Sequence, residues 1–231
     1  MSTTIIRGSC RAALLLAVVG PSSGQDAPKP ARGEEAELIA VLKSKAPREL
    51  RANACRRLSL VGTRECVPAL AALLGDEAMG HMARYALEPI PDPAVDAALR
   101  DALRELKGRP LVGVIGSIGV RRDAEAVDRL AGLLKDGDAE VAQAAAKALG
   151  RIGTDPAVKV LESGLADAPP ANWPAFYEGL FRAADAMATS GRTAEALAIY
   201  GKLTRPEAPP QVRDGAARKA HLLGQEPGQR L

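Results

Sequence analysis

Two stretches in the middle of the chain carry apolar residues along one side of a helix. Apolar side chains recur there at intervals of three and four, which is the spacing of one face of an α-helix. They are Val127, Leu130, Leu133 and Leu134 in the first stretch, and Val141, Ala145, Ala148, Leu149 and Ile152 in the second. The pattern predicts a pair of helices.

This helix pair is one of several similar units. Four segments share an apolar anchor that is followed three positions later by Val or Ile and then by Gly or Pro; the anchors are Leu58, Leu87, Ile115 and Leu149. The anchors are 29, 28 and 34 residues apart, and a valine recurs with a similar period at positions 67, 95, 127 and 158. Because one pair cannot bury its apolar stripe alone, the repetition predicts an all-α solenoid of stacked helix pairs.

The residues between the helices support these boundaries. Asp92-Pro93 and Asp155-Pro156 each place an N-capping side chain before a proline in the first helical turn. Gly62, Gly119 and Gly153 stand where helix ends need a left-handed residue.

The segment DAEVAQAAAKALGRIGTDPAV at 138–158 resembles the HEAT repeat, especially the short bacterial form seen in phycobilisome-lyase-like proteins. The resemblance extends over residues 36–167, although Pro89, Pro91 and Pro110 depart from a regular helix pattern. It implies an α–α superhelix that binds other proteins, and it does not imply an enzyme activity.

A proline-dense segment at 167–174 separates these repeats from the C-terminal part, 168–224. This part resembles a tetratricopeptide-type hairpin, with helices expected over 175–190 and 193–203. The matching residues are Leu180, Ala184, Ala196 and Tyr200. A fifth, elongated HEAT-like pair is the alternative. We expect a cap helix over 209–223 and a disordered tail at 225–231.

The first 24 residues have the layout of a secretory signal peptide. Arg7 and Arg11 precede an unbroken apolar run at 12–19, and small residues follow it. The run is shorter than the ~20 residues of a membrane-spanning helix. We therefore expect a periplasmic or secreted protein with a flexible linker at 25–35 and no membrane segment after signal removal. An extension from a misplaced start codon is the alternative.

Composition and charge exclude several functions. The net charge of +3 is too small for an obvious nucleic-acid surface. The only two histidines, His81 and His221, lie in different modules and do not form a metal centre. Gly113, Gly116 and Gly119 fall in a repeat helix, where they favour close packing over a phosphate loop. We expect no enzyme activity and no cofactor.

Cys55 and Cys66 flank the turn at Gly62 on antiparallel helices. Cys55 precedes that turn by about seven residues, which places it roughly 10 Å along its helix. Because a disulfide needs Cα atoms within ~7 Å of each other, we predict two free thiols. A disulfide, or a redox or metal role, is the alternative.

A candidate binding surface follows from the repeat register. If the apolar stripe of residues 141–152 faces inward, Gln143, Lys147 and Arg151 face outward. The equivalent positions of the other second helices, which line the concave surface in HEAT-like proteins, complete a mixed cationic ladder: Arg56, His81, Tyr85, Arg109, Lys147 and Arg151. Ordinary solubilising residues are the alternative, as is binding around Tyr177 and Tyr200.

These observations predict an exported, non-enzymatic scaffold that binds another protein through its helical-repeat surface. The alternative is an accessory subunit of an enzyme or transport complex, such as a lyase-like HEAT protein. A bilin-binding test separates the two.

Overall fold

The computed structural model describes residues 33–225, and this part of the chain contains α-helices, three short 3-10 helices and no strand. The signal peptide predicted at 1–24, most of the linker predicted at 25–35 and nearly all of the tail predicted at 225–231 lie outside the described residues. The helices are α1 Glu34–Lys43, α2 Arg48–Val61, α3 Val67–Ala71, α4 Gly80–Leu87, α5 Pro93–Glu105, α6 Gly108–Arg121, α7 Val127–Leu133, α8 Ala139–Ile152, α9 Asp155–Asp167, α10 Trp173–Thr189, α11 Thr193–Leu203 and α12 Pro210–Gly224.

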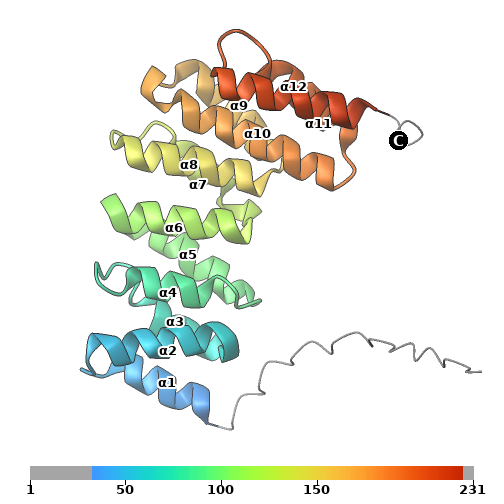
Figure 1. Cartoon of the computed structure of the whole chain (residues 1–231). Helices are drawn as coiled ribbons and strands as arrows, with labels where there is room; N and C mark the ends of the chain where they lie inside the picture. Colours follow the sequence, from blue (N-terminus) through green and yellow to red (C-terminus); the bar gives the residue numbers. More distant parts are fainter. Residues whose placement is uncertain (1–32, 226–231) are drawn as a thin grey trace, which may run out of the picture.

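The helices stack in two layers (Figure 1). Helices α2, α4, α6, α8 and α10 pack side by side in one layer, and α1, α3, α5, α7 and α9 form the other. Helix α11 packs on α10, and α12 packs on α11 at the C-terminal end of the stack. The chain is therefore an all-α solenoid, as the repeat period predicts.

The predicted apolar stripes form the core. All nine residues that define the stripes of α7 and α8 are buried, and one continuous hydrophobic cluster runs from Leu42 to Ala216. Alanines make up much of the contact face of α8, so its neighbours approach closely. None of the helices within residues 33–225 combines the length and the apolar character that a bilayer crossing requires.

The helix starts agree with the sequence at one proline site and differ at the other. The Asp92 side chain accepts a hydrogen bond from the Ala94 amide (2.8 Å), which confirms it as the N-cap of α5. Helix α9 instead begins at Asp155 itself, with Thr154 as N-cap. The Asp155 carboxylate forms an ion pair with Arg192, at the start of α11, and so does not cap its own helix.

The helix ends correct two of the three glycine predictions. Gly153 is left-handed (φ 66°) after α8, as expected, but Gly62 has φ −66° after α2. Helix α6 continues past Gly119, and its left-handed residue is Arg122 (φ 56°). Gly119 serves packing instead, because a Cβ there would lie 2.9 Å from the Ala148 Cα of α8.

The C-terminal helices continue the stack. Helices α10 and α11 match the predicted ranges to within two residues, and Leu180, Ala184, Ala196 and Tyr200 are buried between them and their neighbours. Helix α10 packs directly on α8. Whether α10 and α11 form a tetratricopeptide-type unit or part of a further HEAT-like pair stays a prediction.

Candidate functional site

The six residues of the predicted ladder are all exposed. Arg56 lies on α2, His81 and Tyr85 on α4, Arg109 on α6, and Lys147 and Arg151 on α8, so they occupy four successive helices of one layer. The Tyr85 side chain is 50% exposed, which is unusual for a large aromatic residue. Their outward placement is as predicted; their role in binding stays a prediction.

Two of the six ladder residues line a cleft between α4 and α6. This cleft, of about 390 Å³, is lined by His81, Arg84 and Arg109 together with Asp76 and Glu77. In the repeat register, the position on α6 that is equivalent to Tyr85 of α4 and Lys147 of α8 is Gly113. A Cβ there would lie 2.3 Å from the Arg84 Cζ. The guanidinium of Arg84 therefore lies flat against α6, and its burial lowers its pKa, although the charge of Glu88 opposes that shift.

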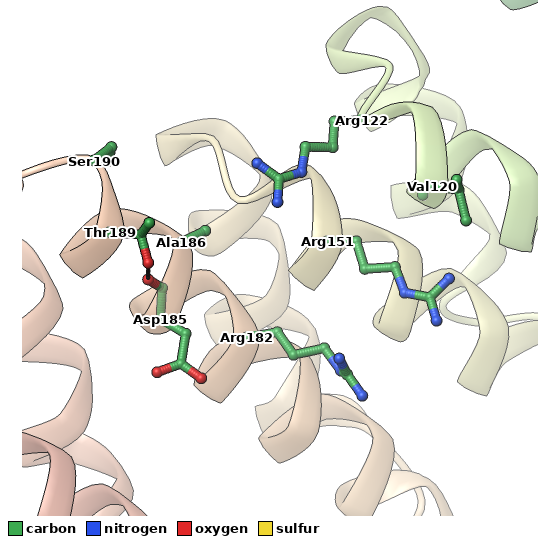
Figure 2. A pocket seen from close by; sticks show the side chains of 9 residues that line it. Val120, Arg122, Arg151, Arg182, Asp185, Ala186, Thr189 and Ser190 are labelled. Atoms are coloured by element: carbon green, nitrogen blue, oxygen red, sulfur yellow. Dashed lines mark hydrogen bonds between the residues drawn. The ribbon is translucent and has the colours of Figure 1, made fainter. Parts of the chain in front are cut away.

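A second hollow, which we call the arginine groove, lies where α6, α8 and α10 end. It has a volume of about 550 Å³ and is lined by Arg122, Arg151, Arg182 and Asp185, with small and apolar side chains between them. Figure 2 shows Arg151 and Arg182 extending toward the same side from neighbouring helices. Of the ladder residues, only Arg151 belongs to this groove.

Two carboxylates beside the groove already have cationic partners. Glu178 accepts hydrogen bonds from Arg182 (3.0 and 2.8 Å) and lies 3.7 Å from Lys147. Burial would raise the pKa of Glu178, but the hydrogen bond from Arg182 and the charge of Lys147 lower it below its usual value. Asp185 accepts from the Tyr200 hydroxyl (2.6 Å) and pairs with Lys219 (2.8 Å), and these contacts tie α10 to α11 and α12.

Arg84, Arg122 and Arg182 are not part of the predicted ladder. Arg84 directly precedes Tyr85 and so lies one residue away from the register position. Arg122 follows the last residue of α6, whereas the sequence predicts that this helix ends earlier, at Gly119. Arg182 lies in the C-terminal part, outside the four aligned repeats. Four residues separate Arg182 from Glu178, which is the spacing of a helix-surface ion pair, and this is a signal that the sequence does contain.

Candidate metal ligands and thiols can be placed within residues 33–225. No cluster of three His, Cys, Asp or Glu side chains able to hold a metal ion occurs there. Cys55 and Cys66 are buried and free; burial raises the pKa of Cys55 to about 11 and that of Cys66 to about 12. Such thiols are poor nucleophiles at neutral pH, because the thiolate is the reactive form. That both stay free in solution remains a prediction.

The family model for HEAT repeats matches residues 111–172, which include most of α6 and all of α7, α8 and α9. Residues 111–172 of this chain are HEAT repeats. The match includes the segment at 138–158 on which the resemblance rested, whereas the likeness to phycobilisome-lyase-like proteins and to tetratricopeptide units stays a prediction.

The chain also has similar solved structures. An engineered protein is 20% identical, with 82% of this chain and 96% of that chain covered and a TM-score of 0.45. A designed armadillo repeat protein is 19% identical over 81% of this chain and 99% of that chain, with a TM-score of 0.44. A second engineered protein is 22% identical over 84% and 58%, with a TM-score of 0.42. No curated protein matches the sequence.

Proposed function

We propose that this protein is an exported, non-enzymatic scaffold that holds another protein on the outward face of α2, α4, α6 and α8. The observation that carries the proposal is the exposed ladder on four successive helices of one layer. A repeat layer presents a long surface that a partner can follow, and repeat proteins use such extended surfaces for binding.

The composition of the ladder supports a protein partner. Arg and Tyr are enriched among the residues that contribute most to protein–protein binding. The half-exposed Tyr85 ring has no aromatic neighbour within residues 33–225, and so it offers apolar area to a partner. The small net charge of the chain argues against a polyanion such as nucleic acid.

The double variant Arg56→Glu/Lys147→Glu is expected to abolish capture of the partner. Both residues are exposed, and Lys147 has only a half-exposed ion pair with Glu178, so the loss of stability stays within about 1 kcal/mol and the thermal transition changes little. The measurement is affinity capture with crosslinking from the envelope fraction of the producing cell, followed by identification of the captured protein.

The matched control is Arg129→Glu/Lys159→Glu, which makes the same charge change on the exposed surface of α7 and α9 in the other layer. This control should capture as well as the unmodified chain. Capture that survives the first double variant, or that both double variants lose equally, contradicts the proposed surface.

The export component is tested separately. We expect the mature chain to begin near Gln25 and to occur in an extracytoplasmic fraction, because residues 1–24 have the charge and apolar pattern of a signal peptide. N-terminal sequencing of the natural protein measures this. Material that starts at Met1 or Ser2 in the cytoplasmic fraction contradicts export without affecting the binding surface.

A further inference from the structure

We propose that the arginine groove binds an acidic segment of a partner protein, with Arg122 and Arg151 holding its carboxylates. This inference rests on the proposed scaffold function and specifies the chemistry of the partner. It assigns a role to a part of the surface that is mostly separate from the predicted ladder.

The first reason is that two guanidinium groups of the groove are uncompensated. Arg122 and Arg151 have no ion pair and donate no side-chain hydrogen bond within residues 33–225. In contrast, Arg182 is held by Glu178. The single carboxylate that lines the groove, Asp185, is already paired with Lys219. Figure 2 shows the Arg122 and Arg151 guanidinium groups pointing to different sides of the groove, so each would hold its own carboxylate of an acidic segment without displacing an internal partner.

The second reason is that these arginines are not needed to complete their helices. The terminal carbonyl groups of Ile118 and Gly119 accept backbone hydrogen bonds from Asp123 and Arg122 (3.2 and 3.3 Å). The Leu149 carbonyl at the end of α8 accepts one from Gly153 (3.0 Å). The side chains of Arg122 and Arg151 are thus available to a ligand.

The third reason is the backbone conformation at Arg122. Its φ of 56° lies in the left-handed region, which residues with a side chain rarely adopt and which Gly153 adopts at the end of α8. An arginine at a position suited to glycine is unfavourable for the fold, and a binding role gives it a reason. Arg151 is also held in place, because its Cδ lies against Gly119, 3.3 Å from where a Cβ would be.

A carboxylate is the anion that arginine holds elsewhere in this chain. The chain already holds carboxylates with the planar fork of arginine: Nε of Arg57 contacts one oxygen of Glu34, and Nη2 contacts the other at 3.1 Å. Val120, which is 49% exposed, and Ala186 add apolar walls that suit the side chains of a peptide. A volume of about 550 Å³ is in the range of pockets for small ligands.

The test uses the full chain and a fluorescein-labelled hexaglutamate peptide, with binding followed by fluorescence anisotropy at low salt and at ~0.15 M salt. We expect binding that weakens with salt. Arg122→Gly/Arg151→Ala should weaken it about tenfold, because it removes two exposed charge pairs that each contribute roughly a factor of three. Arg122→Gly relieves the left-handed strain, so that single variant should also unfold at the same or a higher temperature, which separates loss of binding from loss of fold.

The matched control is Arg64→Ala/Arg129→Ala, which removes two exposed arginines outside the groove and should leave the affinity nearly unchanged. The proposal is overturned if hexaglutamate does not bind, or if the two double variants bind it equally. It is also overturned if a phosphoserine peptide or an oligonucleotide binds the same arginines much more tightly than hexaglutamate does. None of these outcomes decides the scaffold function, which is tested by capture with the Arg56→Glu/Lys147→Glu variant.

Discussion

Replacing Gly179 with alanine is expected to lower the free energy of unfolding by about 2 kcal/mol. Gly179 lies at the contact between α10 and α8, where a Cβ would come within 2.6 Å of the Ala146 carbonyl oxygen. On the opposite helix, a Cβ at Gly150 would lie 2.4 Å from the Gly179 Cα. Since the obstructing atoms belong to the backbone, the two helices must move apart, and the helix propensity of alanine, worth about 1 kcal/mol, offsets only part of the cost.

Gly116 provides the matched control for this substitution. It lies in the middle of α6, and a Cβ there would meet no atom within 4 Å. Gly116→Ala should therefore raise the free energy of unfolding by up to about 1 kcal/mol, opposite in sign to Gly179→Ala. Urea unfolding followed by circular dichroism measures both. Equal effects of the two substitutions would show that α8 and α10 do not approach as closely as the structure places them.

This helix contact shows what the sequence could and could not predict about the fold. The stripes of α7 and α8 were predictable because apolar residues spaced by three and four leave few alternatives to a buried helix face. The contact between Gly150 and Gly179 was not, because a glycine has the same appearance at a helix end, in a loop or at a close approach. Similarly, the proline-dense segment at 167–174 predicts a break between the repeats and the C-terminal part, whereas the structure places α10 directly on α8.

The same distinction applies to the candidate site. The outward position of Lys147 and Arg151 followed from the stripe on the other side of α8. The position of Arg122 depends on α6 continuing past Gly119, and Gly119 stays helical because it packs on Ala148 of the next repeat. Such contacts between repeats lie outside the information in a local pattern, which is why the arginine groove appears only in the folded chain.

Arg121→Ala is expected to lower the free energy of unfolding by about 3 kcal/mol, the largest effect among these substitutions. The Arg121 guanidinium binds both oxygens of Asp96 and donates to the backbone carbonyls of Glu88 (3.0 Å) and Ile90 (2.7 Å). Its side chain is 11% exposed. One arginine thus joins α5, α6 and the turn after α4, and the hydrogen bond to Asp96 raises its pKa, so it stays charged at any practical pH.

Alanine at position 121 leaves the carbonyls and the Asp96 carboxylate without their donor, and lysine restores only part of the loss because it lacks the planar fork. Arg104→Ala is the matched control, since the Arg104–Asp101 pair is exposed on both sides (65% and 68%) and such pairs contribute at most about 1 kcal/mol. Chemical denaturation of the three variants should therefore rank them with Arg121→Ala least stable, Arg121→Lys intermediate and Arg104→Ala close to the unmodified chain. If Arg121→Ala were no less stable than Arg104→Ala, the turn after α4 would be held by its apolar contacts, such as buried Ile90, and the guanidinium would contribute only what an exposed pair does.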